Sequence, residues 1–291
     1  MIQSVWRQLR ITLEMIKIEH TVFALPFAFI GAVLAERGIP PLRTCFWILM
    51  AMIWARSAAM AFNRLVDARI DADNPRTRNR ALPRGLVSRG YVTGFVLVCS
   101  GMFLLSAWML NRLSFILAFP ALALVLAYSF SKRFTSFSHI LLGLALSIAP
   151  VGGWIAVTGR LDPETLLLCL VVVTWVAGFD IVYSCQDVGF DSKFGLFSIP
   201  ARWGVPRALA ISFGLHILTI VALFLVYFTF RLSWFSLAGI TALSGILVYE
   251  HIVIRPGDLT RVNMAFFTLN GIFSISLFIL VLGDVLLFPT S

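Results

Sequence analysis

Long apolar runs alternate with short polar connections along the chain, and this pattern predicts helices that cross a membrane. A helix needs about 20 apolar residues to span the hydrocarbon core of a bilayer. Charged residues, glycine and proline separate nine such runs: Thr21–Ala35, Leu42–Leu65, Tyr91–Leu110, Ser114–Phe130, Phe137–Val157, Pro163–Cys185, Ala208–Phe230, Trp234–Ile254 and Val262–Leu287. The first run is short, and we expect its helix to begin earlier, near Leu13.

The sequence therefore predicts an all-α, polytopic membrane protein with nine transmembrane helices and a single domain over residues 1–291. Composition agrees, because 59% of the residues are hydrophobic and only 13% are charged, whereas a soluble domain carries about 25% charged residues. The four cysteines lie in or beside apolar runs, without CxxC spacing. A disulfide framework and a zinc site are therefore both disfavoured.

The basic residues predict the orientation of the chain in the bilayer. With the N-terminus in the cytoplasm, 17 of the 23 Lys and Arg residues fall in cytoplasmic connections, five fall on the opposite side, and Arg56 lies inside a run. Such an excess indicates a cytoplasmic N-terminus. The net charge of +9 then reflects membrane topology, and no nucleic-acid partner is expected. The long polar connections share the cytoplasmic side, where we expect the chemistry.

Two groups of carboxylates stand at the ends of the second and sixth runs. Like charges four residues apart on a helix repel each other, and a membrane boundary raises the cost of keeping them. A solvated helix end explains one such pair, but two pairs are harder to explain in this way. The first group is Asn63, Asp67 and Asp71, on one helical face; the second is Asp180, Tyr183, Asp187 and Asp191.

The two groups form a faint internal repeat. Asp67 and Asp187 are 120 residues apart, and so are Asp71 and Asp191. This offset predicts two pseudo-repeated four-helix halves plus a ninth helix. If the two groups face each other, four carboxylates surround one cavity.

The residues around the carboxylates indicate which ligand they hold. Carboxylate oxygens suit Mg²⁺, which prefers carboxylates together with substrate phosphate oxygens. Basic residues follow both groups, and membrane topology alone accounts for only part of them. Carboxylates interleaved with arginines favour a metal-bridged polyanion such as diphosphate. These basic residues are Arg76, Arg78, Arg80 and Arg84 after the first group, and Lys193 and Arg202 after the second.

These motifs resemble those of the UbiA superfamily of intramembrane prenyltransferases, over essentially the whole chain and in order. Asn63-x3-Asp67-x3-Asp71 resembles the first aspartate-rich motif, and Asp180-x2-Tyr183-x3-Asp187-x3-Asp191 resembles the second. Further segments also match: Arg56, Thr77-Arg78-Asn79-Arg80-Ala81-Leu82-Pro83-x-Gly85, Tyr128-x3-Lys132-Arg133-Phe134-Thr135 and Gly195-x2-Ser198-Ile199-Pro200.

One departure from the family pattern bears on the branch within it. Many members have Asp directly after the Asn of the first motif, whereas Arg64 stands here. Together with the residues 76–83, Arg-Thr-x-Asn-Arg-Ala-Leu-Pro, this is similar to the branch linked to futalosine-route menaquinone synthesis. The segment at 128–135 resembles the 4-hydroxybenzoate type rather than the haem farnesyltransferase or chlorophyll synthase type.

The resemblance implies an enzyme of a bacterial inner membrane, with its active site facing the cytoplasm. It would transfer a polyprenyl group from an allylic polyprenyl diphosphate to an aromatic acceptor, either 4-hydroxybenzoate or 1,4-dihydroxy-6-naphthoate, in ubiquinone or menaquinone biosynthesis. Mg²⁺ is the implied cofactor, held by Asn63, Asp67, Asp71, Asp187 and Asp191. The implied diphosphate-binding residues are Arg78, Arg80 and Lys193.

The remaining implied roles concern catalysis and the acceptor. The catalytic set is Asp187, Asp191, Tyr183 and Arg133, and the acceptor-binding set is Arg133, Arg56 and Tyr128. Arg133 is expected to bind the acceptor carboxylate, although a topology-setting charge explains it equally well. The two tyrosines would stabilise an allylic cation, or else belong to an interfacial aromatic belt. Arg56 is also a candidate partner for Asp180.

Two other classes of protein remain to be weighed. A transporter or cation channel also keeps carboxylates in the membrane, but usually near the midplane on broken helices. Here the carboxylates lie at helix ends beside arginine-rich connections, which favours an enzyme. A structural assembly subunit would not need paired carboxylates. The prenyl chain length and the oligomeric state stay open.

Overall fold

The computed structural model describes residues 2–16 and 24–288, almost all of them helical. The first part of the chain forms α1 (Ile2–Ile16), α2 (Leu25–Glu36), α3 (Leu42–Asp73), α4 (Arg89–Leu110), α5 (Arg112–Ala127), η2 (Tyr128–Arg133) and α6 (Ser138–Thr158). The second part forms α7 (Glu164–Ser184), η3 (Cys185–Asp187), α8 (Val188–Lys193), α9 (Ile199–Trp203), α10 (Val205–Phe230), α11 (Trp234–Val253), α12 (Val262–Met264), the π-helical turn η4 (Ala265–Leu269) and α13 (Asn270–Leu287).

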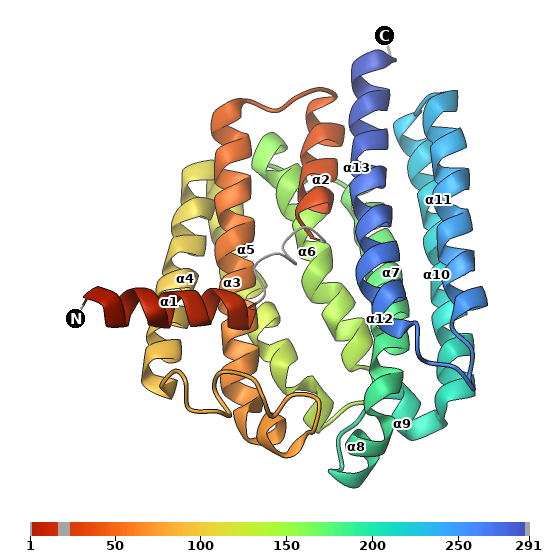
Figure 1. Cartoon of the computed structure of the whole chain (residues 1–291). Coiled ribbons are helices and arrows are strands. Elements are labelled where there is room, and N and C mark those ends of the chain that lie inside the picture. The colour runs from red at the N-terminus through yellow and green to blue at the C-terminus, as the bar shows by residue number, and fades with distance from the viewer. Residues whose placement is uncertain (1, 17–23, 289–291) are drawn as a thin grey trace.

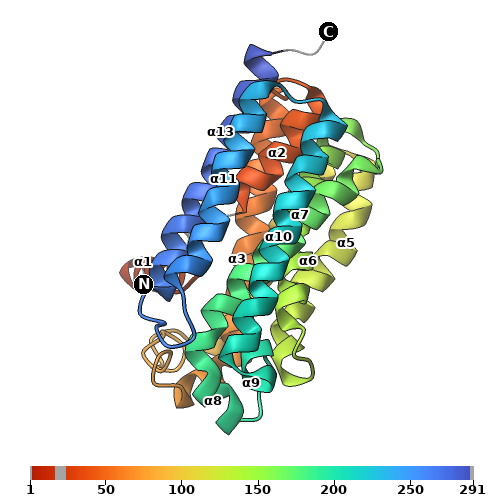
Figure 2. The ribbon, with the colours of Figure 1, turned by 90° about the vertical axis from the view of Figure 1, so that its right-hand side faces the viewer.

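The long helices stand side by side in one bundle, and α1 lies across them (Figure 1). The most extensive contacts join α3 to α4, α6 to α7, α7 to α10 and α2 to α6. Figures 1 and 2 both place the end of α3, the connection 74–88 and α8 at one end of the bundle. The chain thereby brings both predicted carboxylate groups to the same end.

Eight of the predicted membrane-spanning runs are confirmed as helical segments that are long and apolar enough to cross a membrane. The predicted count of nine is not. The first run corresponds to α2, which has 12 residues and is therefore about 18 Å long at 1.5 Å per residue. Residues 17–23 lie outside the described part of the chain, so the whole of that run is not covered.

The expectation that the first helix begins near Leu13 was wrong. Leu13 belongs to α1, which runs crosswise to α2 (Figure 1). The reason is the polarity of the segment. Arg10 and Glu14 form an exposed ion pair at 2.9 Å, whereas Met15 and Ile16 pack against α3 and α4. An amphipathic helix of this kind suits an interface rather than a span.

Close backbone contact fixes α2 against α6. A Cβ atom at Gly153 of α6 would collide with the carbonyl oxygen of Ala28 in α2, and one at Gly31 would collide with that of Pro150. Small residues let membrane helices approach in this way. The position of α6 matters because His139, in its first turn, lies 2.7 Å from Asp180 of α7.

The core sits around α7, whose Trp175 is 1% exposed. The indole Nε1 of Trp175 donates to Asn270 Oδ1 at 2.8 Å. Asn270 Nδ2 in turn donates to the carbonyl of Ala265 at 3.1 Å, across the π turn η4. Irregular π turns are frequent at functional sites. This one contains Phe266, whose ring contacts Tyr183 near the C-terminal end of α7.

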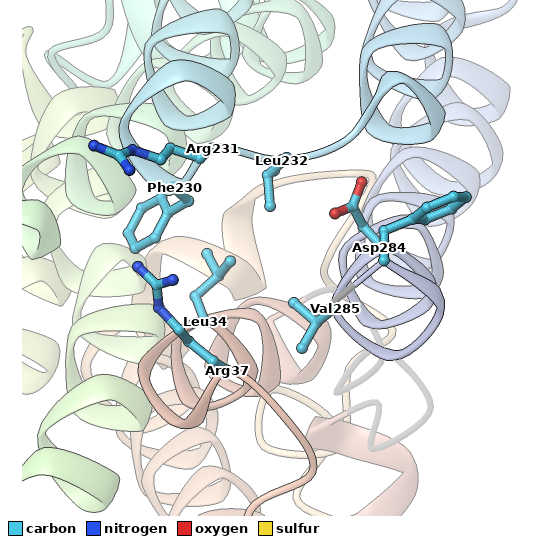
Figure 3. Close-up of a pocket in the computed structure, with 8 residues that line it drawn as sticks. Leu34, Arg37, Phe230, Arg231, Leu232, Asp284 and Val285 are labelled. Atoms are coloured by element: carbon cyan, nitrogen blue, oxygen red, sulfur yellow. The ribbon is translucent and has the colours of Figure 1, made fainter. Parts of the chain in front are cut away.

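A cavity opens at the opposite end of the bundle, where α2, α10 and α13 end (Figure 3). Its one carboxylate, Asp284, has a structural role at the start of α11. It accepts from the backbone N of Ser233 at 3.0 Å and from the hydroxyl of Ser233 at 2.6 Å. The lining residues are Leu34, Arg37, Phe230, Arg231, Leu232, Asp284, Val285 and Phe288.

Candidate active site

The first carboxylate group lies on the last turns of α3, a single helix of 32 residues. Asn63 Nδ2 donates to Asp67 Oδ2 at 3.0 Å, as the spacing of four predicts. After α3 ends, the chain turns back at once. Asn74 Oδ1 accepts from the backbone N of Arg76 at 2.9 Å, and the buried Thr77 hydroxyl donates to the carbonyl of Asp71 at 3.1 Å. These bonds hold the start of the connection 74–88 beside the carboxylates.

Each carboxylate of the first group is bound by an arginine. Arg80 Nη1 lies 2.7 Å from both Oδ1 and Oδ2 of Asp71. Arg133 Nη2, at the end of η2, lies 3.0 Å from Asp67 Oδ1 and also donates to the carbonyl of Val66. Two predicted site residues, Arg80 and Arg133, are therefore close to the predicted metal ligands.

The second carboxylate group lies on a broken helix rather than on one continuous face. The helix α7 ends at Ser184, a 3₁₀ turn carries Asp187, and Asp191 belongs to the short α8. Both carboxylates are buried. Asp191 Oδ2 accepts from the hydroxyl of Ser198 at 2.9 Å, and the same hydroxyl caps α9 by accepting from the backbone N of Ala201 at 3.3 Å.

Arg76 joins the two groups. It leaves the chain just after α3, yet its Nε lies 2.9 Å from Asp187 Oδ1 and its Nη2 lies 2.5 Å from Oδ2. Its Nη1 also donates to the hydroxyl of Tyr183 at 3.1 Å, and the guanidinium carbon lies 5.4 Å from the centroid of that ring. Burial opposes the charge of Arg76, but the hydrogen bonds and charge of Asp187 outweigh it and raise the pKa of Arg76 above its ordinary value.

Asp180, one to two turns deeper on α7, is bound by a residue that the sequence did not single out. His139 Nδ1 lies 2.7 Å from Asp180 Oδ2, while its Nε2 accepts from the backbone N of Ile199 at 3.3 Å. The acceptor role of Nε2 places the proton on Nδ1, which therefore donates to Asp180. Arg56, the expected partner of Asp180, is half-buried within α3.

Lys132 and Arg76 belong to segments that the sequence analysis named, but neither was assigned a role in the site. Lys132 lies close enough to Asp67, Asp180 and Asp191 for its charge to act on all three. The sequence signal for Lys132 was its position directly before Arg133 in the segment 128–135. For His139 the signal was an ionisable residue inside a predicted span, which is a functional candidate by default.

The other predicted site residues lie further from the carboxylate oxygens. Tyr128 is near enough to Asp67 and Asp180 to feel their charges. Lys193 Nζ lies 5.9 Å from the centroid of the Phe194 ring, and Arg78 is exposed in the connection 74–88. In the part of the chain that the structure describes, neither of these two cations makes a hydrogen bond or ion pair to the carboxylates.

The sequence pattern of the UbiA prenyltransferase family matches residues 24–274. This chain belongs to the UbiA prenyltransferase family.

Relatives in the UbiA family are named for different prenyl acceptors. The chain is 30% identical over 283 residues to a protoheme IX farnesyltransferase from Methylococcus capsulatus, covering 96% of this chain and 94% of that protein. It is 32% identical over 230 residues to a 4-hydroxybenzoate octaprenyltransferase from Nitrosomonas eutropha, covering 78% and 75%. Family membership is therefore confirmed, while the futalosine-linked branch stays a prediction.

Solved structures of UbiA homologues share the fold. One from Aeropyrum pernix has a TM-score of 0.80 at 30% identity and covers 93% of this chain and 98% of its own. One from Archaeoglobus fulgidus, solved with GPP and Mg²⁺, has a TM-score of 0.69 at 18% identity and covers 93% and 99%. The second likeness concerns the fold alone.

The donor set of this UbiA-family chain fits Mg²⁺. Within the described residues, no group of three or more His, Cys, Asp or Glu side chains is placed to hold one metal ion. However, Mg²⁺ is usually bound by one or two carboxylates, with water and substrate phosphates completing its octahedron. Each group supplies two of the predicted carboxylate ligands, and three of these four already bind an arginine.

An aromatic wall leads from the carboxylates into the bundle. The ring centroids of Tyr183 and Phe266 are 4.2 Å apart, and those of Phe266 and Phe179 are 5.2 Å apart. Trp175 continues the series at 4.9 Å from Phe179, and Phe27 lies 4.9 Å beyond it. The series begins at Tyr183, whose hydroxyl accepts from Arg76 Nη1 beside the carboxylates.

Proposed function

We propose that this protein transfers a polyprenyl group from an allylic polyprenyl diphosphate to an aromatic hydroxy acid, in a Mg²⁺-dependent reaction of quinone biosynthesis. One observation carries the proposal. Four aspartates and their interleaved arginines meet at one end of a membrane bundle, where the aromatic wall begins. The fold and the family support prenyl transfer, and the arrangement of charge supports diphosphate as the leaving group.

The carboxylates would hold the metal. Asp67 and Asp71, with Asn63 as a neutral ligand, and Asp187 and Asp191 are the proposed ligands. When bound, Mg²⁺ neutralises the charge that develops on the departing diphosphate, an electrostatic contribution that is usually large in such chemistry.

The cations of the chain would bind the diphosphate directly. Arg80 lies at Asp71 and is well placed to reach phosphate oxygens beside a metal held there. Arg78 and Lys193 stand in the adjoining connections, and both are exposed. Guanidinium groups bind phosphate oxygens in a two-pronged fork, which orients the leaving group as well as attracting it.

Tyr183 is the proposed stabiliser of the allylic cation. The C–O bond to the diphosphate breaks, the cation forms next to the aromatic ring, and a carbon of the acceptor ring attacks it and then loses its proton. The guanidinium of Arg76 already lies over the ring of Tyr183, at 5.4 Å from its centroid, so this position suits a positive charge. A cation over an aromatic face is stabilised by the ring quadrupole.

The acceptor would lie near η2. Arg133 already binds a carboxylate, that of Asp67, and it would bind the carboxylate of 4-hydroxybenzoate or 1,4-dihydroxy-6-naphthoate in the same manner. Tyr128 and Arg56 are the further acceptor-binding candidates. Arg64 and the residues 76–83 favour the naphthoate of the menaquinone route.

The surroundings of the site fit a membrane substrate. A long isoprenyl tail would enter from the bilayer and lie beside the half-buried rings of Tyr183 and Phe266. The excess of basic residues at this end supports a cytoplasmic orientation in a bacterial inner membrane. The carboxylates lie at helix ends rather than at the midplane of the bundle, which argues against a transporter or cation channel.

The test is transfer of a labelled prenyl group in proteoliposomes. With Mg²⁺ and a labelled allylic diphosphate, we expect product with 4-hydroxybenzoate or the naphthoate and none with haem. Asp67→Ala and Asp191→Ala should each lower transfer at least about 100-fold. Asp73→Asn, at an exposed carboxylate on the same helix as Asp67, is the matched control and should retain transfer. Activity that survives both Asp→Ala changes would overturn the proposal.

A further inference from the structure

Arg76 occupies the position on Asp187 that a bound metal ion would take. It binds both oxygens of Asp187 with Nε and Nη2, which is the fork geometry of the strongest arginine–carboxylate pairs. The carboxylate is buried, with its side chain 11% exposed. A divalent cation that binds Asp187 must therefore displace at least one nitrogen of this guanidinium.

Displacement alone would leave two like charges side by side. The guanidinium keeps its proton under all working conditions, so a metal ion at Asp187 would meet a released cation within a few ångströms. A diphosphate removes the conflict, because its oxygens bind the metal and the guanidinium together. The charge pattern thus favours simultaneous entry of metal and diphosphate over entry of the metal alone.

The backbone around Arg76 keeps the released side chain within reach of such an anion. The backbone N of Arg76 is held by Asn74 Oδ1, and the buried Thr77 is held to the carbonyl of Asp71. The backbone thus stays fixed beside the first carboxylate group, while the side chain extends to the second. A change of partner then needs side-chain rotation but no movement of the connection.

From this geometry we propose that Arg76 is an exchange residue. It binds Asp187 until a metal diphosphate arrives, then yields the carboxylate to the metal and binds the diphosphate. The inference rests on the proposed function and adds to it a positioning residue and a rule: metal and diphosphate each bind weakly alone and strongly together. Such coupling between two ligands is reciprocal, and typical values are 5–150-fold.

Metal binding to the full chain in lipid nanodiscs tests the exchange without any turnover. Mn²⁺ replaces Mg²⁺ because free Mn²⁺ is measured by its paramagnetic resonance signal, and geranyl diphosphate is the second ligand. Arg76→Gln should bind Mn²⁺ alone about tenfold more tightly than the wild type, since the competing cation is gone. The same variant should show a smaller gain in Mn²⁺ affinity on addition of geranyl diphosphate.

Arg84→Gln is the matched control. It removes one positive charge from the same connection at an exposed position, where salt screens the charge. Its Mn²⁺ affinity should stay within about twofold of the wild type. Equal tightening in both variants would mean a general charge effect and would overturn the proposal.

The remaining outcomes are also decisive. Folded Arg76→Gln with unchanged or weaker Mn²⁺ affinity would overturn the exchange. If this variant does not fold, Arg76→Lys replaces it: the charge stays but the fork is lost, so Mn²⁺ should bind more tightly than in the wild type. Unchanged binding by the lysine variant would overturn the exchange as well. The proposed function fails separately, when the wild type performs no Mg²⁺-dependent prenyl transfer.

Discussion

The two carboxylate groups carry the same charges but are built in different ways. The first lies on the unbroken α3, and both of its aspartates are bound by arginines. The second crosses a 3₁₀ turn, and its Asp187 depends on Arg76, which comes from the connection after α3. The internal repeat of the sequence therefore does not extend to the source of the neutralising charge.

The basic residues that follow the second group explain this asymmetry. Lys193 lies over the ring of Phe194, and the guanidinium carbon of Arg202 lies 5.3 Å from the centroid of the Trp203 ring. They thus contact aromatic neighbours, and Asp191 is bound by the hydroxyl of Ser198 alone among its described hydrogen bonds. The connection 74–88 supplies cations to both groups, and a change there should affect the whole site.

The largest expected effect comes from removing the shared cation. Arg76→Ala should lower prenyl transfer about 100-fold, because the diphosphate loses a fork-shaped partner of the kind whose removal costs this much in other electrostatic sites. Lys193→Ala should lower it only a few-fold. Initial rates in proteoliposomes at saturating Mg²⁺ measure both, with Arg84→Ala as the control. A larger loss for Lys193→Ala would reverse the proposed division between the two connections.

A smaller effect is expected on stability. Asp71→Asn leaves Arg80, whose side chain is 27% exposed, without its charged partner, and should lower the free energy of unfolding by about 1–3 kcal/mol. Asp191→Asn keeps an acceptor for the Ser198 hydroxyl and should cost less than about 1 kcal/mol. Thermal unfolding in detergent compares the two. Equal costs would show that the groups are not neutralised in different ways.

The smallest effect concerns two serines that cap helices. Ser198 caps α9 and also donates to Asp191, whereas Ser88 only caps α4, where its hydroxyl accepts from Tyr91 N at 3.1 Å. Loss of a cap costs about 1 kcal/mol, so Ser88→Ala reports the cap alone. Ser198→Ala should cost about 1 kcal/mol more and raise the Mg²⁺ concentration needed for transfer a few-fold. Matching results would remove Ser198 from the site.

Periodicity predicted most of the fold because lipid imposes it. An apolar run of about 20 residues has one low-energy structure in a bilayer, so eight runs are found as helices close to their expected bounds. The expectation that the first helix begins near Leu13 was wrong because polarity sets the structure of that segment. The segment around Leu13 contains Arg10 and Glu14, so α1 is amphipathic and lies across the bundle (Figure 1).

Within the candidate site, the sequence predicted what is local. The spacing of Asn63 and Asp67 placed them in contact, as found. It did not predict Arg76 on Asp187, because these residues are 111 positions apart and no helical period relates them. The same holds for His139 on Asp180. Pairing across helices depends on how the bundle packs, which the pattern of a single helix does not contain.

The π turn η4 has a consequence for how the wall beside Tyr183 is shaped. A π turn holds one residue more than an α turn, and each helical residue turns the chain by about 100°. Shortening residues 265–269 by one would therefore rotate Phe266 away from Tyr183, while Asn270–Leu287 kept their neighbours. Chain length at this turn, rather than residue type, sets whether the ring of Phe266 meets that of Tyr183.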